Sequence, residues 1–403
     1  MEPLDEERRA PRRERLAWLI GFGIGSMAWN ICWPFLPLRV YAVGVADLSD
    51  VARIAGLLAG GTNLVTALLG PFWSQLGERY GYRLQIMRAH LGTSLSMSLI
   101  GLAATPLQLA GAGVVLGSLG GNYPHYMALV ASRTPASEVG RVVGDMQAAG
   151  QIGGTIGPLI GGVIASQLGL SASFVVSGAT SLLGIVVVAA LVRPDRGGRH
   201  AVAGPPRGGV REALGRPETR RLMLLMIAGD AAVQGLRPLI PVMIQARLSD
   251  PAAVATATGL ATTMQTGATV IAALVVGRLS KRVPPRRILL VTLPAAVLCA
   301  AAVPLVDGLT PLMILWTLLG LSSGATVPAI FAWLGRVAPS SSGGFALLAT
   351  ASMLAFAVGP AVMGQATVYG LEAPFRLAAL CTLGGVALVF ASDPKPAPAQ
   401  AIG

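Results

Sequence analysis

The chain has 403 residues, of which 53% are hydrophobic and only 12% are charged, and its mean hydropathy is +0.67. These values exclude a soluble globular protein, because a core of ordinary size cannot bury so many apolar segments of about twenty residues. The formal net charge of +12 does not indicate a nucleic-acid partner, because the arginines form short blocks between apolar runs with no nucleic-acid-binding motif around them.

Twelve apolar spans, each long enough to cross a lipid bilayer, are predicted along the chain. They lie near residues 16–41, 51–74, 84–104, 107–131, 142–166, 170–192, 221–247, 252–277, 288–306, 309–334, 344–368 and 373–391. A segment rich in Gly, Pro and Arg, residues 193–220, separates the sixth span from the seventh and is interpreted as a linker. The sequence predicts an all-α integral membrane protein with two six-helix halves, residues 1–192 and 221–403.

The ends of the chain and its cysteines indicate no processing or cofactor chemistry. The first apolar run continues past twenty residues with no small-residue cleavage site, so we expect no cleaved signal peptide. Cys32, Cys299 and Cys381 each fall inside an apolar span and far apart in sequence, which favours simple burial over a disulfide or a metal site. No cofactor and no metal are expected.

The distribution of basic residues predicts the orientation of the spans. Twenty-five of the thirty Lys and Arg residues fall in the N-terminus, the even-numbered connections, the linker and the C-terminus, with Arg88 counted among them. Basic residues are enriched in cytoplasmic loops. We therefore expect both termini and the linker in the cytoplasm, and the protein in the cell membrane.

The two halves share an internal repeat, which is common in transporters. The matches occur at offsets of 202 to 204 residues, and they pair Pro34 with Pro238, Pro37 with Pro241, Gly117 with Gly320, Gly121 with Gly324, Pro124 with Pro328 and Gly157 with Gly359. Single matches would be weak, because small residues and Pro are frequent in membrane helices. The consistent register indicates two related halves.

Two motifs carry a resemblance to a known family. Residues 70–83, GPFWSQLGERYGYR, resemble the loop signature of the major facilitator superfamily, and residues 277–282, GRLSKR, resemble its weaker partner in the second half. The fifth span resembles the glycine-proline motif of the drug:proton antiporters of that superfamily. Its residues are Gly144, Gly153, Gly157, Pro158, Gly161 and Gly162. The resemblance covers all twelve spans, is closest to bacterial multidrug efflux proteins, and implies the twelve-helix major facilitator fold.

The loop motif suggests a conformational latch made of Glu78, Arg79, Gly81 and Arg83. An acid and a base at the cytoplasmic end of a span can pair with a neighbouring helix end and its dipole, and so hold one conformation closed. Ordinary cytoplasmic loop charge explains the same residues equally well.

The fifth-span motif also has two interpretations. Its glycines allow another helix to approach closely, and Pro158 is expected to bend the helix and free a backbone carbonyl. The motif could provide tight packing alone, or the bend could seal one side of the protein and so favour exchange over leakage. The resemblance favours the seal.

Span seven contains the best candidate for a coupling site. Asp230 lies about 14 Å into the span, close to the midplane, and Arg237 lies two turns further on the same face, with Gln234 between them. Burial would favour a neutral Asp230, whereas an arginine partner would favour the carboxylate. Asp230 is therefore a candidate site for a proton or a cationic substrate, and a structural ion pair with Arg237 is the alternative.

Spans one and four supply the predicted lining of a substrate cavity. These polar and aromatic residues are Asn30, Trp33, Asn122, Tyr123, His125 and Tyr126. His125 and His90 could relay protons, although a lone histidine in a helix bundle is more often a satisfied hydrogen-bonding residue. Proteins of the family that couple to protons usually have an arginine in span four, where this chain has Gly113. If coupling exists here, Asp230 or Arg237 would have to supply it.

These features predict a monomeric secondary transporter that moves a small molecule by alternating access. The leading hypothesis is export of an amphipathic drug or secreted metabolite, coupled to protons. Import of a siderophore or nutrient, and a non-transporting role on the same fold, are the alternatives. The sequence contains no phosphate-binding loop of the type GxxxxGK[ST], which argues against ATP as the energy source, and no catalytic cluster, which argues against an enzyme.

Overall fold

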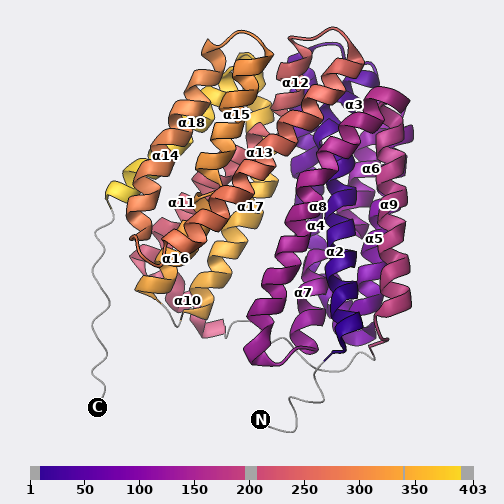
Figure 1. Cartoon of the computed structure of the whole chain (residues 1–403). Helices are drawn as coiled ribbons and strands as arrows, with labels where there is room; N and C mark the ends of the chain where they lie inside the picture. The colour runs from indigo at the N-terminus through magenta and orange to yellow at the C-terminus, as the bar shows by residue number, and fades with distance from the viewer. Residues whose placement is uncertain (1–9, 196–206, 339–340, 392–403) are drawn as a thin grey trace. The chain divides into compact units, whose positions relative to one another are not determined.

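The computed structural model describes residues 10–195, 207–338 and 341–391 and confirms the predicted all-α fold, since these residues form helices and short connections with no strand (Figure 1). The first half contains α2 (Arg12–Cys32), the 3-10 turn η1 (Trp33–Phe35), α3 (Leu36–Ala42), α4 (Leu48–Tyr80), α5 (Tyr82–Leu102), α6 (Pro106–Leu119), α7 (Tyr123–Ser132), α8 (Ala136–Leu168) and α9 (Leu170–Leu191). The break between α3 and α4 ends at Asp47, whose carboxylate accepts hydrogen bonds from the amides of Ser49 and Asp50.

The second half begins within the predicted linker, because residues 207–215 form a helix; residues 196–206 lie outside the described residues. Its elements are α10 (Arg207–Gly215), α11 (Pro217–Leu236), α12 (Leu239–Gln245), α13 (Pro251–Leu279), α14 (Pro285–Ala302), η2 (Val303–Leu305), α15 (Leu309–Ser323), α16 (Thr326–Val337), α17 (Ser342–Ala366), η3 (Thr367–Tyr369) and α18 (Ala373–Phe390). Pro217 and Pro285 each stand in the first turn of a helix, where the missing N–H costs nothing.

Ten helical segments are long and apolar enough to cross a membrane, and they coincide with ten of the twelve predicted spans. The third and fourth predicted spans are not among them. Span three is α5, which carries Arg83 and Arg88, and span four is broken into α6 and α7, of 14 and 10 residues. At a rise of 1.5 Å per residue α6 alone covers about 21 Å, less than the hydrocarbon thickness. The crossing of these two segments stays a prediction.

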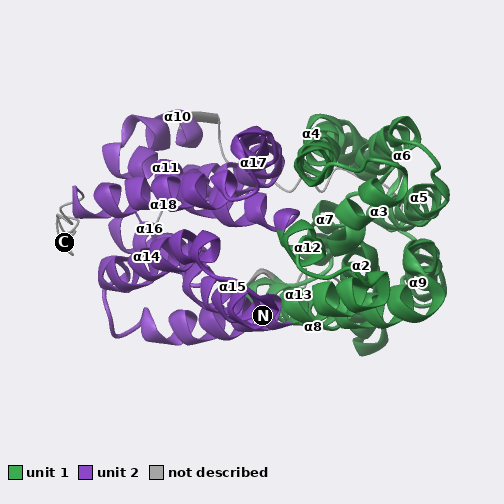
Figure 2. Ribbon diagram, turned by 90° about the horizontal axis from the view of Figure 1, so that it is seen from above, with its two compact units in different colours: residues 1–202, 240–263 green, residues 203–239, 264–403 purple. Residues whose placement is uncertain are grey.

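The described chain forms two compact units (Figure 2). Unit 1 consists of residues 1–202 and 240–263, and unit 2 consists of residues 203–239 and 264–403, so the chain passes between the units after residues 202, 239 and 263, the last of these within α13. The two predicted halves, residues 1–192 and 221–403, were defined by the sequence repeat, whereas the two units are defined by contacts. The division into halves therefore stays a prediction.

Glycines bring helix backbones into contact inside unit 1. A Cβ atom added at Gly153 or Gly161 would collide with the carbonyl oxygen of Gly23 or Ile31 on α2, and one at Gly157 would lie 2.9 Å from the Met27 carbonyl oxygen. Three glycines of the predicted antiporter motif therefore seat α8 along α2. α8 is one continuous helix that contains Pro158, and the bend expected there stays a prediction.

The remaining glycines of the motif have different surroundings. Gly162 faces α13, where its added Cβ would lie 3.2 Å from the Cα of Gly259, and Gly144 is exposed in unit 1. Unit 2 repeats the α2–α8 contact as α11–α17, because a Cβ at Gly359 would lie 2.5 Å from the Ala231 carbonyl oxygen. Lipid supplies no hydrophobic force between helices, so such close contacts hold each bundle together.

We predict that Gly161→Val destabilises the protein by about 2 kcal/mol or prevents its folding, because the α2 backbone cannot move away without opening the whole α2–α8 contact. Thermal unfolding and the monodisperse yield of detergent-solubilised protein measure the effect. Gly144→Val, at the exposed end of the same motif, is the control and should leave both values near wild type. Equal losses for the two variants would contradict the packing role of Gly161.

Candidate substrate and proton pathway

A cavity of about 270 Å³ lies among α2, α4, α5, α6, α7 and α9 of unit 1. Three residues predicted from the sequence line it, namely Asn30, Asn122 and Tyr123. The sequence analysis missed a second polar group on α4, whose lining residues are Thr62, Asn63 and Thr66. Their spacing of three and four residues within an apolar span was the signal that could have revealed them. The lining side chains are hydroxyls, amides, aromatic rings and apolar groups, and none of them is charged.

Two other predicted lining residues pack elsewhere. The Trp33 ring stands 4.3 Å from that of Trp29, which lines the cavity in its place. Tyr126 is buried, and its hydroxyl lies 3.1 Å from Nε2 of His90, whose Nδ1 lies 3.3 Å from the Ser181 hydroxyl. Both ring nitrogens of His90 therefore contact uncharged partners, which favours the structural alternative for this histidine.

His125 is buried on α7, immediately beyond the residues that line the cavity. Its Nε2 lies 3.2 Å from Nη2 of Arg88 on α5. Arg88, which the sequence places just inside the third span and counts with the cytoplasmic basic residues, is partly buried, and its guanidinium lies 3.8 Å from the centre of the Trp73 ring. The structure thus brings His125 next to a cation within the helix bundle.

In unit 2, Asp230 is buried between α11 and α17. Its Oδ2 accepts a hydrogen bond of 2.6 Å from the Ser352 hydroxyl, and its Oδ1 accepts one of 3.1 Å from Nε2 of Gln234. Arg237 follows α11 at the break before Pro238 and is exposed in unit 2. No ion pair joins Asp230 to Arg237 among the described residues, so the carboxylate is held by neutral donors.

The comparisons with known proteins agree with this architecture. The family model described as Major Facilitator Superfamily matches residues 18–309 and 222–403. The chain belongs to the major facilitator superfamily. It is 29% identical to the multidrug resistance protein MdtG of Citrobacter koseri over 82% of this chain and 81% of that protein, and 30% identical to MdtG of Serratia proteamaculans over 78% and 77%.

A solved structure shows the same fold. The bacterial homologue of the human lysosomal transporter Spinster, in an inward-facing and occupied conformation, superposes with a TM-score of 0.72 at 18% identity, covering 94% of this chain and 95% of that one. The chain is therefore a multi-pass membrane transport protein of the drug efflux branch of the superfamily.

The superfamily's loop motif takes a compact form here. α4 and α5 are separated by Gly81 alone, which has φ +99° and is therefore in a backbone region that favours glycine. Asp195 caps the start of α5 by accepting hydrogen bonds from the amides of Tyr82 and Arg83. Nη2 of Arg83 donates to the carbonyl oxygen of Ala189 at 2.7 Å, near the end of α9. Gly81 and Arg83 therefore lie where α5 contacts the end of α9 and the residues that follow it.

Glu78 and Arg79 of the same motif are exposed in unit 1. The Arg79 guanidinium lies 5.2 Å from the Tyr80 ring centre, and among the described residues Glu78 forms no ion pair. Asp195 was not identified from the sequence, because it stands among the polar residues of the linker.

At the position in span four where proton-coupled members of the superfamily usually have an arginine, this chain has Gly113. Thr62 on α4 donates a hydrogen bond of 3.2 Å to the Gly113 carbonyl oxygen, and a Cβ at Gly113 would lie 3.1 Å from that hydroxyl. The α4–α6 contact therefore requires a small residue at position 113.

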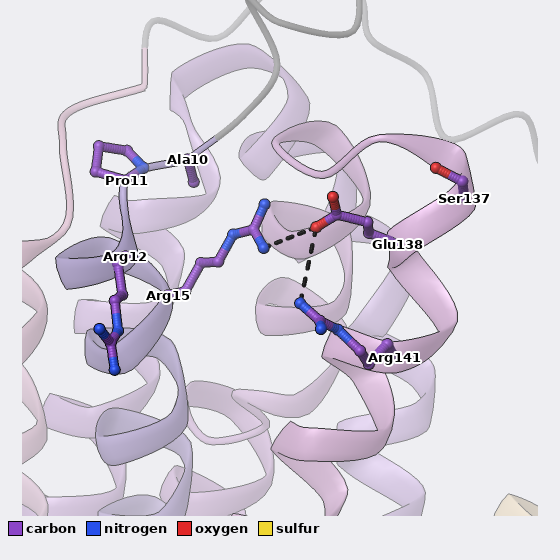
Figure 3. Close-up of a pocket in the computed structure, with 7 residues that line it drawn as sticks. All are labelled: Ala10, Pro11, Arg12, Arg15, Ser137, Glu138 and Arg141. Atoms are coloured by element: carbon purple, nitrogen blue, oxygen red, sulfur yellow. Dashed lines mark hydrogen bonds and ion pairs between the residues drawn. The ribbon is translucent and has the colours of Figure 1, made fainter. Parts of the chain in front are cut away.

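A charged pocket of about 810 Å³ lies at the start of α2 and α8 (Figure 3). Glu138 pairs with Arg15 at 2.8 Å and with Arg141 at 3.9 Å, and Arg133, directly after the end of α7, pairs with buried Glu14. These ion pairs connect the polar ends of α2, α7 and α8. None of the charged residues that form them lines the uncharged cavity described above.

We predict that Asp195→Ala lowers the free energy of unfolding by about 1 kcal/mol. The backbone amides at the start of α5, directly after Gly81, lose the carboxylate that accepts their hydrogen bonds. Thermal unfolding in detergent measures the change. Asp307→Ala, in an exposed connection, is the control. An unfolding temperature equal to that of the control would contradict the capping role.

Proposed function

We propose that the chain exports a small amphipathic organic compound by alternating access, driven by protons that bind at Asp230. The multidrug resistance proteins at 29 to 30% identity support export. The uncharged cavity of hydroxyl, amide and aromatic groups suits a ligand with both polar and apolar surface. As an antiporter, the protein uses no cofactor and works as a monomer in the cell membrane.

The single observation that carries proton coupling is the contrast between Asp230 and its repeat-related position in unit 1. Ser26 occurs 204 residues before Asp230, and Gly150 occurs 202 residues before Ser352. In unit 1 the Ser26 hydroxyl donates to the Gly150 carbonyl oxygen at 2.7 Å, so the α2–α8 contact is completed without a charge. The matching α11–α17 contact needs no carboxylate for packing, and a buried carboxylate that packing does not require is best explained by function.

The two neutral hydrogen-bond partners of Asp230 fit a site that alternately gains and loses a proton. Ser352 can donate to the carboxylate, or accept a hydrogen bond from the protonated form after rotation of its hydroxyl. Gln234, which contacts the same carboxyl group, has both a donor and an acceptor in its amide. A fixed arginine at this distance would instead hold the charged form permanently.

The loop and span-five motifs are assigned to the conformational cycle. Glu78, Arg79, Gly81 and Arg83 form the proposed cytoplasmic latch, and Arg83 and Gly81 already join α5 to the end of α9. Gly153, Gly157 and Gly161 keep α8 sealed on α2, which supports exchange over leakage. The excess of Lys and Arg in the connections named above supports a cytoplasmic location for both termini.

We predict that Asp230→Asn abolishes proton-driven export. Cells that express wild type should accumulate about tenfold less of at least one compound in a panel of labelled hydrophobic drugs and siderophores, and a protonophore should remove the difference. Asp230→Asn should accumulate as much as cells without the protein. Asp145→Asn, on the exposed face of α8, is the matched control and should behave as wild type.

Higher accumulation in wild-type cells would mean import instead of export. Equal accumulation of every compound, with the protein present at normal level in the membrane, would contradict transport of these compounds altogether.

We predict a smaller effect for Ser352→Ala, because the carboxyl group loses one donor but keeps Gln234. Export should fall about fivefold, the cost of one buried hydrogen bond. Thr350→Ala is the control on the same helix, since its hydroxyl bonds only the α17 carbonyl of Ala346 among the contacts found. Export by Ser352→Ala equal to that of the control would remove Ser352 from the proton site.

A further inference from the structure

The break between α6 and α7 is a place where polar backbone lies inside a helix bundle. α6 ends at Leu119, Gly121 has φ +81°, and α7 begins at Tyr123. A helix end leaves its last carbonyl groups without intrahelical partners, and lipid offers no donors to replace them. The break must therefore be closed by side chains from neighbouring helices.

Two side chains satisfy the end of α6. Nε1 of Trp73 on α4 donates to the Ser118 carbonyl oxygen at 2.7 Å, and Nη1 of Arg88 on α5 donates to the Leu119 carbonyl oxygen at 2.6 Å. The guanidinium is stacked on the Trp73 ring, and its Nε donates to Oε1 of Gln85 at 2.9 Å. A cation at the carboxyl end of a helix is also favoured by the helix dipole.

The same guanidinium reaches the first turn of α7. Its Nη2 lies 3.2 Å from Nε2 of His125. Arginine has only donors, so this contact is a hydrogen bond only when Nε2 of His125 carries no proton. A proton on Nε2 would place two N–H groups and two positive charges face to face.

Few other charges act on His125. The elements packed against α7 are α2, α4, α5 and α8. On these elements, Arg88 is the charged side chain that contacts His125 among the described residues. The other titratable groups have partners elsewhere: His90 contacts Tyr126 and Ser181, Glu14 pairs with Arg133, and Glu138 pairs with Arg15. Glu78, Arg79 and Asp145 are exposed.

We propose that Nε2 of His125 is a second proton-binding site, and that Arg88 is the positioning residue that couples it to the cavity. With His125 neutral, Arg88 bridges the Leu119 carbonyl and the imidazole and holds α6 and α7 in one arrangement. Protonation removes the acceptor, the guanidinium leaves the imidazole, and α7 is released from α6. Gly121, Asn122 and Tyr123 lie in this break and line the cavity, so its shape changes with the proton.

This inference rests on the proposed function and adds a site in unit 1 to the Asp230 site of unit 2. It also assigns a role to Arg88, whose charge is partly buried and engaged by Trp73, Leu119, Gln85 and His125. About 9 Å separate Arg88 from the start of α5, so the cation lies within the helix bundle and not in a loop.

The test uses the full chain in liposomes, with a compound that wild type exports in the accumulation assay. Two rates are measured between about pH 4 and about pH 8, a window that extends below the usual histidine range because an arginine lies next to His125. One rate is net transport driven by an imposed pH gradient, and the other is exchange of labelled for unlabelled compound at equal pH. Exchange requires a folded protein and an intact cavity but no net proton movement, so it separates a coupling defect from misfolding.

We expect His125→Gln to lower net transport about tenfold and to remove its pH dependence, while exchange stays within about twofold of wild type. Arg88→Gln should give the same flattened pH profile, and the double variant should be no worse than either single one, because both residues act through one contact. His90→Gln, which alters a buried histidine without an arginine neighbour, is the matched control and should keep the wild-type pH profile.

A wild-type pH profile in His125→Gln, or additive losses in the double variant, would overturn the second proton site while leaving the Asp230 proposal intact. Loss of exchange would show that a variant at position 125 does not fold. In that case the single variant Arg88→Gln, which keeps His125, tests the proposal: a flattened pH profile supports it and a wild-type profile contradicts it. Absence of pH-driven transport in wild type itself would instead overturn the proposed proton coupling and this inference with it.

Discussion

Contact between helix backbones at glycine positions is the interaction on which both units depend. Helices in lipid associate through van der Waals packing and hydrogen bonds, because the hydrocarbon tails are as apolar as the side chains. α8 reaches α2 in this way, and α17 reaches α11. At such distances a short hydroxyl side chain spans the gap, as Thr62 does to the Gly113 carbonyl and Ser26 does to that of Gly150. The close packing therefore determines which polar groups are used up and which remain for a ligand.

The internal repeat extends from the sequence to individual contacts. Thr66 donates to the Gly117 carbonyl oxygen in unit 1, and Thr269, 203 residues later, donates to that of Gly320 in unit 2. Arg83 binds carbonyl oxygens near the end of α9, and the repeat-related Arg286 binds those of Val389 and Phe390 at the end of α18. These paired contacts give each half the same scaffold, although the two sequences share few identical residues.

The sequence sufficed for the helical class, for ten of the spans and for the family, because each depends on hydrophobic runs or short motifs that a single segment contains. It also located polar residues such as Asn122 and Asp230 inside spans. It could not decide which of them meet, since the partner of each comes from another helix. Ser352 was missed because a lone serine in an apolar span carries no signal. Arg88 was placed just inside the third span but grouped with the cytoplasmic basic residues, because its partners come from other helices.

The sequence left open an ion pair between Asp230 and Arg237, and the described residues contain none between these two side chains. Both residues occur on one face of an ideal helix, but α11 ends at Leu236, and Pro238 follows. A proline lacks the backbone N–H that would continue the hydrogen-bonding pattern, so the regular helix is interrupted after Leu236 and resumes as α12 at Leu239. Helical periodicity predicts neighbours only as far as the helix continues, and span seven contains its break at the residue that mattered.

The residues to which we assign proton binding lie at positions where the two halves do not repeat each other. Equivalent contacts would make the two units mechanically alike, which alternating access requires, but identical chemistry would provide no site for a coupling ion. Unit 2 has a buried carboxylate where unit 1 has Ser26, and unit 1 has a partly buried arginine at a helix break where the matching residue, 203 positions later, is Val291. Each of these differences puts a charge inside one bundle at a position where the repeat-related residue of the other half is uncharged. Because burial of charge is costly, such departures are the positions at which proton binding can be converted into movement of helices.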